Sequence, residues 1–344
     1  MPAQLQPRLP GAAKQLAARV VEIIDETADT RTFVLRVGGS WPGHLAGQYI
    51  PVEAEIDGVR VRRCYSISSG ASRPGATRIA ITVKRMPGGK MSTWLHHHVR
   101  RGDTLQIGEP AGDFVVGAGR PLLLVGGGSG MTPIIAIVRD LLARGELKTS
   151  SGAARVVVVH AARSDTDAIF AADLAAIESR APGLYVLAHR DAHDGRLDAA
   201  ALARLVPDLR RREVFVCGPA GLMDLVTEAA TAAGAPVHHE RFVAAPLART
   251  RDSQPGNNGT PALHAIQLRG RRVAVAGTGP LLGELERAGE RPPHGCRMGI
   301  CNSCRCHKAS GTVEDLVTGA VSSEPDQEIR LCVSVARSDL ELAL

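Results

Sequence analysis

The sequence predicts a multidomain chain in which an antiparallel β-barrel is followed by an α/β domain with a parallel sheet and by a small α+β domain. Residues 18–117 contain short strand-like runs separated by turn residues, the pattern of a small barrel. Residues 118–245 alternate apolar runs with helical patterns, and residues 262–344 have apolar strands of their own. A chain of 344 residues is too long for one ordinary core, which favours several domains, with residues 1–17 as an N-terminal extension.

The barrel prediction depends on strands and one clear turn. Apolar and β-branched runs at 19–24, 31–37 and 78–84 predict strands. Asp57-Gly58 lies between two further runs and is typical of a two-residue hairpin turn. A short helix is expected over 92–99.

The α/β prediction depends on alternation, because parallel strands are joined by crossover helices. The expected strands are 121–125, 155–160, 184–189 and 213–217, and the expected helices are 132–144, 166–178 and 220–233. Residues 246–261 are expected to form a linker, because they end in a polar segment rich in glycine, proline and asparagine that can bury very little.

Composition excludes several classes of protein. With 44% hydrophobic and 22% charged residues the chain is expected to be globular and soluble. The net charge of +6 is scattered and no basic stripe carries interleaved aromatic residues, so no nucleic-acid binding is expected. The first seventeen residues lack any apolar run, so no ordinary secretory signal is expected, and no stretch reaches the roughly 18 apolar residues that a membrane span needs. We therefore expect a cytoplasmic protein without an integral membrane segment.

A cysteine cluster gives the sharpest chemical signal. Cys296, Cys301 and Cys304 follow the C-x4-C-x2-C spacing of plant-type [2Fe–2S] proteins, and Cys332 supplies a fourth thiolate. Gly295 and Gly299 would let the loop backbone approach the sulfurs and donate hydrogen bonds to them.

Zinc is the alternative metal, but zinc sites usually contain two C-x2-C pairs and this chain has one. Cys306 is expected to be a spectator. The segment after residue 261 otherwise resembles plant-type ferredoxins, which implies a β-grasp fold for this domain.

Arg63-Cys64-Tyr65-Ser66 ends a predicted strand and matches R-x-Y-S/T, the flavin motif of the ferredoxin–NADP reductase superfamily, which this chain resembles. The resemblance implies that Arg63 contacts the flavin phosphate, that Tyr65 stacks near the isoalloxazine and that Ser66 hydrogen-bonds its edge. A guanidinium suits this task because it offers two donors to a phosphate.

Two more segments match the same superfamily. Residues 88–93 match its G-G-x-x-S element before a helix, where backbone N–H groups can hold a pyrophosphate. The expected ligands there are Gly89, Met91, Ser92 and Thr93. Residues 108–114 match its closing barrel strand. The expected flavin is FAD, with FMN as the alternative.

The nicotinamide site is expected at a glycine-rich turn. Residues 122–125 lead into a G-x-G-x-x-P sequence that starts at Gly128, and a helix follows. In the superfamily, Thr132 and Cys217 would line the nicotinamide pocket. The expected nucleotide ligands are Gly128, Gly130, Thr132, Arg163, Cys217, Gly218 and Pro219.

Arg163 decides our expectation for the nucleotide, because an arginine after the second strand can hold a 2′-phosphate. Asp165 lies nearby and a solvated loop cation is the alternative, so NADPH is expected while NADH stays possible. Glu240-Arg241-Phe242 resembles the segment that lies against the flavin in flavohaemoglobin-type relatives. The candidate catalytic residues are Tyr65, Ser66, Cys217, Glu240 and Phe242. His96-His97-His98 and His238-His239 are expected to serve packing or the surface.

These parts imply one order of electron flow. A nicotinamide gives two electrons as hydride, a cluster accepts one at a time and a flavin can do both. The expected order is therefore nicotinamide, FAD, [2Fe–2S] cluster and external acceptor. The layout resembles reductase components of oxygenases, most of all those that serve membrane di-iron acyl desaturases and alkane hydroxylases. Reductases of Rieske-type or steroid hydroxylases are the alternative. A redox sensor or carrier without turnover is less favoured because the nicotinamide site is complete, and a self-contained oxygenase lacks a visible ligand set.

Overall fold

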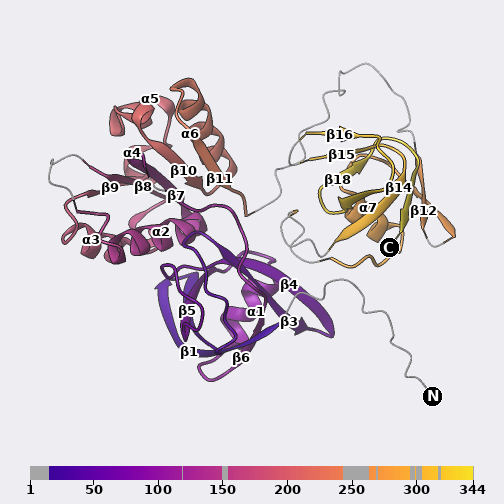
Figure 1. The fold of residues 1–344 in the computed structure, drawn as a ribbon, viewed down its shortest axis with the longest axis horizontal. Coiled ribbons are helices and arrows are strands. Elements are labelled where there is room, and N and C mark those ends of the chain that lie inside the picture. The colour runs from indigo at the N-terminus through magenta and orange to yellow at the C-terminus, as the bar shows by residue number, and fades with distance from the viewer. Residues whose placement is uncertain are drawn as a thin grey trace. The chain divides into compact units, whose positions relative to one another are not determined.

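A computed structural model describes residues 15–117, 119–148, 154–242, 263–268, 270–294, 299, 304–316 and 319–343. The chain divides into two compact units, Met1–Glu240 and Arg241–Leu344 (Figure 1). The first unit contains the predicted barrel and the predicted α/β domain, and the second contains the predicted α+β domain.

The barrel is a six-stranded antiparallel sheet with the order β4-β3-β6-β1-β2-β5. Its elements are β1 (Leu16–Thr27), β2 (Thr30–Val37), β3 (Tyr49–Ile56), β4 (Val59–Ser66), β5 (Arg78–Lys84), α1 (Lys90–His98) and β6 (Thr104–Ile107). A bridge between Ile67 and Ile81 joins the two ends of the sheet, and alternate strand residues fill the interior. The turn between β3 and β4 has positive φ at both Asp57 and Gly58, as the sequence predicts.

The α/β domain has a parallel sheet with the order β11-β10-β7-β8-β9. Its strands are β7 (Leu122–Gly127), β8 (Val156–Ala162), β9 (Leu184–Arg190), β10 (Glu213–Cys217) and β11 (Val237–Glu240). Its helices are α2 (Met131–Ala143), α3 (Ala171–Glu178), α4 (Asp191–Asp194), α5 (Ala199–Leu205) and α6 (Ala220–Ala232). Figure 1 shows α2 and α3 on one face of the sheet and α5 and α6 on the other. The strand order reverses between β7 and β10, and in open α/β sheets ligands bind beyond the carboxyl ends of the strands at that point.

Two elements differ from the sequence-based expectation. The helix expected over 166–178 begins at Ala171, because Phe170 has a left-handed φ of 63° and a short 3₁₀ turn occupies Asp165–Asp167. Residues 108–114 form no strand: Ala111 forms a single bridge with Tyr49, and Gly108 N donates to Pro51 O at 2.8 Å. Gly112 has a φ of 112° and Pro110 lacks an N–H, so the last strand of the barrel is β6 instead.

The second unit is built on a five-stranded sheet with the order β13-β12-β19-β14-β17, in which β12 and β19 are parallel, and on a three-stranded sheet with the order β16-β15-β18. Its elements are β12 (His264–Leu268), β13 (Arg271–Val275), α7 (Leu281–Arg287), β14 (Arg305–Ser310), β15 (Val313–Asp315), β16 (Val321–Ser322), β17 (Gln327–Arg330), β18 (Ser334–Ala336) and β19 (Leu340–Ala343). Apolar residues of α7 pack into one core with Cys304, Cys306 and Cys332. The barrel, the parallel sheet and the α+β domain together confirm the predicted fold class.

Candidate functional site

Two glycine-containing loops meet at the point where the strand order reverses. A Cβ at Gly130 would overlap the carbonyl oxygen of Cys217 and would lie 2.6 Å from the backbone nitrogen of Gly218. Gly218 has a φ of 159°, and its own Cβ would lie 3.1 Å from the nitrogen of Gly127. The backbones that follow β7 and β10 therefore touch without side chains between them. We call this surface, formed by Gly130, Cys217 and Gly218, the glycine floor, and a nucleotide can approach it closely.

The helix that follows the first glycine turn presents its N-terminus to the same place. Gly128 has a φ of 54° and open space where its side chain would lie. Thr132 is buried, and its Oγ1 donates a hydrogen bond to the carbonyl of Ser129 at 2.9 Å. Pro219 caps the start of α6. Two helix N-termini, those of α2 and α6, thus lie beside the glycine floor, where their N–H groups favour an anion.

β4, the strand that carries the flavin motif, reaches the same carboxyl end of the parallel sheet. Ser66, at the end of β4, donates a hydrogen bond from Oγ to Glu240 Oε2 at 3.4 Å. Glu240 ends β11 and pairs with Cys217 in the parallel ladder. Tyr65 is half-buried beside Ser66, and Phe242 is half-buried two residues beyond Glu240. The structure therefore brings Ser66, Cys217 and Glu240 together.

The buried ionisable groups in this cluster favour their neutral forms. Burial, together with the nearby Asp113 carboxylate, raises the pKa of Glu240 to about 8, although the hydrogen bond from Ser66 lowers it. Burial also raises the pKa of Cys217 well above its ordinary value, and Glu240 adds to that shift. A neutral carboxyl can donate a proton to a hydrogen bond, which an ionised one cannot.

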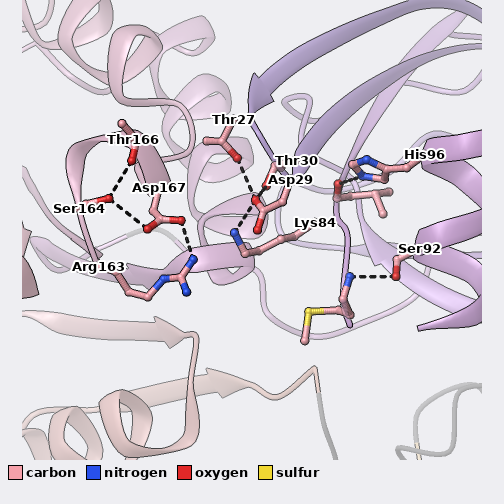
Figure 2. A network of polar contacts seen from close by, with 12 residues as sticks. Thr27, Asp29, Thr30, Lys84, Ser92, His96, Arg163, Ser164, Thr166 and Asp167 are labelled. Carbon is pink, nitrogen blue, oxygen red and sulfur yellow. Dashed lines mark hydrogen bonds and ion pairs between the residues drawn. The ribbon is translucent and has the colours of Figure 1, made fainter. Parts of the chain in front are cut away.

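The turn before α1 is open to a phosphate. A Cβ at Gly88 would meet nothing within 4 Å, and α1 begins directly after Gly89. The Ser92 hydroxyl accepts from Met86 N at 3.1 Å (Figure 2). It also donates to Gly89 O at 3.2 Å, so this side chain stabilises its own turn. Met91 is buried and the amide of Thr93 bonds Gly89 O at 3.0 Å. Arg63 donates from Nη1 to the carbonyl of Arg62 at 2.8 Å.

Arg163 lies in a separate polar network after β8. Its Nη2 pairs with Asp167 Oδ1 at 2.6 Å, and Ser164 donates to the other oxygen of Asp167 at 3.1 Å (Figure 2). The Arg163 hydrogen bond holds the pKa of Asp167 below its ordinary value. Arg163 is 72% exposed, so the guanidinium is accessible to a ligand.

Two of the four predicted cluster ligands lie among the described residues. The Sγ atoms of Cys304 and Cys332 are 3.2 Å apart in the core of the second unit, and Gly299 N donates to Cys332 Sγ at 3.1 Å. Cys296 and Cys301 lie outside the described residues. Burial raises the pKa of Cys306 to about 12, and its thiol lies 3.5 Å from the carbonyl of Ala343. Two sulfurs side by side with a backbone donor are suited to hold a sulfide-bridged cluster.

Several residues that shape these sites were not among the predicted site residues. Asp113 acts on Glu240 from the segment after β6, and Arg190 pairs with Asp165 at 2.9 Å from the end of β9. Only the packing of distant segments brings these groups together. His96 and His238 serve packing, as expected: His96 bonds the carbonyl of Val83 at 2.8 Å, and His238 stacks on Phe215.

Comparison with known proteins defines the class. Residues 17–116 match the oxidoreductase FAD-binding domain, residues 124–228 the oxidoreductase NAD-binding domain, and residues 265–337 the 2Fe-2S iron-sulfur cluster binding domain. The chain is therefore a flavin- and iron–sulfur-containing NAD(P)H oxidoreductase whose cofactors are FAD, NAD(P)H and a [2Fe–2S] cluster.

Similar proteins define the family. The chain is 33% identical to an NADPH oxidoreductase of Mycobacterium tuberculosis, over 96% of this chain and 85% of that protein. It is 30% identical to the glycine betaine monooxygenase reductase subunit of Chromohalobacter salexigens, over 94% of each chain. Phthalate dioxygenase reductase is similar in structure, with a TM-score of 0.65 and 25% identity over 96% of this chain and 98% of that one. The chain belongs to the ferredoxin–NADP reductase superfamily, in the three-domain group with a C-terminal [2Fe–2S] domain. Among the described residues, no helix combines the length and the apolar character that crossing a bilayer requires.

Proposed function

We propose that this chain is the reductase component of an oxygenase system, and that it passes electrons from NADPH through FAD and the [2Fe–2S] cluster to a separate terminal enzyme. One observation carries this proposal. The glycine floor at Gly130, Cys217 and Gly218 lies at the same carboxyl end of the parallel sheet as the Ser66–Glu240 hydrogen bond. A nicotinamide held at the glycine floor and a flavin held beside Ser66 and Glu240 would be neighbours.

When bound, the nicotinamide would supply hydride, the flavin would take up its two electrons, and the [2Fe–2S] cluster would carry electrons singly. The protein's own task is to bind the cofactors, to orient them and to exclude water from the site. We assign Arg63 to the flavin phosphate, Tyr65 and Ser66 to the isoalloxazine, and the backbone of residues 89–93 to the pyrophosphate. The open space at Gly88 and the start of α1 directly after Gly89 support the last assignment.

For the nucleotide we assign Gly128, Gly130, Thr132, Cys217, Gly218 and Pro219, and we assign Glu240 and Phe242 to the segment that lies against the flavin. For the cluster we assign Cys296, Cys301, Cys304 and Cys332. Thiolate ligands of this kind persist in a reducing compartment, so a cytoplasmic location is part of the same proposal.

Preference for NADPH is assigned to Arg163, whose exposed guanidinium lies after β8. The relative named as an NADPH oxidoreductase supports this choice. Arg163→Ala should raise the KM for NADPH by about tenfold and change the KM for NADH by less than about twofold, because only NADPH carries the 2′-phosphate. Arg210→Ala is the control, since that arginine is exposed in the turn before β10, at the amino ends of the parallel strands. Equal changes for both nucleotides would leave Arg163 without a role in selectivity.

The terminal partner can be tested directly. The relatives that serve betaine monooxygenase and phthalate dioxygenase favour a partner oxygenase of that kind. A membrane di-iron desaturase or alkane hydroxylase is the other candidate, supported by the domain layout alone. Purified reductase with NADPH should sustain substrate turnover by one of these two partner classes in reconstituted assays. If neither wild-type flavin nor cluster absorbance bleached anaerobically with NADPH or NADH, the proposed function would fall.

A further inference from the structure

Arg139 ties the nucleotide domain to the flavin-motif segment. It lies on α2, and its Nη1 donates to the carbonyl of Ser68 at 2.7 Å. Its Nη2 forms an ion pair with Asp173 on α3, and its guanidinium lies 5.3 Å from the centroid of the Phe170 ring. One side chain therefore joins the chain just beyond β4 to two helices of the α/β domain.

Ser68 is itself held firmly in the barrel. Its amide bonds Ala80 O at 2.8 Å, and its Oγ lies 2.9 Å from Thr82 Oγ1. The row of hydroxyls continues from Thr82 to Thr32 at 2.7 Å and from Thr32 to Glu26 at 2.6 Å. Ser68, Thr82 and Thr32 are all buried. The carbonyl that Arg139 binds is thus fixed by three strands of the barrel.

The two domains also touch directly at this point. A Cβ at Gly70 would lie 3.2 Å from Asp140 N and 3.5 Å from the carbonyl carbon of Arg139. The backbone beyond β4 therefore packs against the backbone of α2 without a side chain between them. A shift of α2 along this contact would break the Arg139–Ser68 hydrogen bond.

Both ends of this connection lead to the proposed reaction site. Ser68 is two residues beyond Ser66, and Thr132 lies seven residues before Arg139 on α2, about 10 Å along the helix. We propose that Arg139 is a positioning residue, which sets the distance between flavin and nicotinamide by fixing α2 on the segment that follows the flavin motif. This inference rests on the proposed function, because it assumes that Thr132 and Ser66 face the two reacting rings.

The physical reason for an arginine is its planar fork. One nitrogen can bind the Ser68 carbonyl while another binds the Asp173 carboxylate, so the guanidinium is oriented at both ends. A lysine has the charge but has no second donor fixed in the same plane. Hydride transfer is steeply sensitive to such positioning, since a displacement of about 1 Å can cost on the order of 100-fold in rate.

The experiment measures anaerobic flavin reduction by NADPH in stopped flow with the full chain. Arg139→Met should lower the limiting reduction rate by about 10- to 100-fold and weaken the charge-transfer absorbance between nucleotide and flavin. The dissociation constant for NADPH and the FAD content should remain within about twofold of wild type, since Arg139 contacts neither binding loop. Arg139→Lys should recover part of the rate.

Arg144→Met is the matched control. Arg144 caps α2 and pairs with Asp140 and Glu146, all within the nucleotide domain. It should keep the wild-type rate and charge-transfer band. Should Arg139→Met fail to retain FAD, Asp173→Ala replaces it. That variant keeps the Ser68 bond but removes the partner of Arg139 Nη2, so it should slow reduction less, with the same weakened band.

The outcomes separate the two proposals. Wild-type protein that neither nucleotide reduces would refute the proposed function. If the wild type is reduced, three results would overturn the role of Arg139 alone. These are an unchanged reduction rate in Arg139→Met, an equal loss of rate in Arg144→Met, and a loss in Arg139→Met that affects only the affinity for NADPH.

Discussion

Gly130 shows how a single missing side chain can shape the nucleotide site. Its position is helical, so its backbone angles suit any residue, and what excludes a side chain is the carbonyl of Cys217. Gly130→Ala should push the β7 and β10 loops apart, weaken NADPH binding by about tenfold and lower the free energy of unfolding by about 1–3 kcal/mol. Fluorescence titration and thermal unfolding measure the two effects.

Gly283→Ala is the control for this prediction. Gly283 lies in α7 of the second unit with nothing within 4 Å of its would-be Cβ. Alanine there should leave binding unchanged and stabilise the helix by about 0.5–1 kcal/mol. Similar binding by both variants would mean that the contact with Cys217 does not shape the site.

Glu240 makes the stability of the first unit depend on pH. Its pKa is raised to about 8 in the folded protein, above the ordinary value of 4.5, so the folded state holds a proton that the unfolded state has lost. The corresponding stabilisation is complete below about pH 4.5 and is lost as the pH rises through about 8. Glu240→Gln, which stays neutral, should be more stable than wild type above pH 8, by on the order of 1–3 kcal/mol.

Thermal unfolding of both proteins between pH 6 and pH 9 tests this prediction. The difference in melting temperature should grow up to about pH 8 and then level off, because folding of the wild type requires Glu240 to take up a proton, which costs more as the pH rises until the folded carboxyl itself ionises. A constant difference across this range would show that Glu240 does not titrate there. Glu213→Gln is the control, since that glutamate is only partly buried at the start of β10 and pairs with His238 at 2.8 Å.

At the scale of elements, β17 anchors the cluster loop. Arg330 ends this strand, donates from Nη1 to Gly299 O at 2.5 Å and pairs with Asp315 at 2.9 Å. The amide of the same Gly299 donates to Cys332 Sγ. Arg330 therefore holds the peptide that points its N–H at a sulfur, and its positive charge lies near the site where an electron would arrive.

Arg330→Met should lower the reduction potential of the cluster by on the order of tens of millivolts, because fewer dipoles and charges would stabilise the reduced form. A spectroscopic redox titration measures the potential, with Arg305→Met as the control. Arg305 pairs with Glu328 at 2.9 Å on the exposed side of β14 and should leave the potential unchanged. An unchanged potential in both variants would restrict Arg330 to a structural role.

The helices and strands were largely predictable from the sequence, whereas the contacts between residues of different elements were not. The expected strand at 78–84 has the bounds of β5, and the Asp57-Gly58 turn lies between β3 and β4, because local periodicity and turn chemistry decide both. The start of α3 was missed because the left-handed Phe170, which lies under Arg139, depends on tertiary packing. Motifs pointed to Ser66 and Cys217, but their contacts with Glu240 required the strand order of the folded sheet.

At the scale of the whole molecule, the two compact units divide the chemistry. The first unit contains the regions that match FAD- and NAD-binding domains, and the second contains the match to the 2Fe-2S domain. Each unit has its own core, so a change at the cluster should not disturb hydride transfer. Because the two units belong to one chain, the effective concentration of the second unit around the first is high. This favours electron transfer within one chain over transfer between chains.

Cys332→Ser tests this division in the full chain. Cys332 is buried in the core of the second unit, 3.2 Å from Cys304, and a serine would remove one thiolate without changing the first unit. Cluster absorbance should be lost and NADPH-driven cytochrome c reduction should fall by about tenfold or more, whereas anaerobic flavin reduction should stay within about twofold of wild type. Cys306→Ser is the matched control, because its sulfur lies 3.5 Å from the Ala343 carbonyl and is not a predicted cluster ligand, so this variant should leave both activities intact. Slowed flavin reduction in Cys332→Ser alone would mean that the two units are coupled before any electron moves between them.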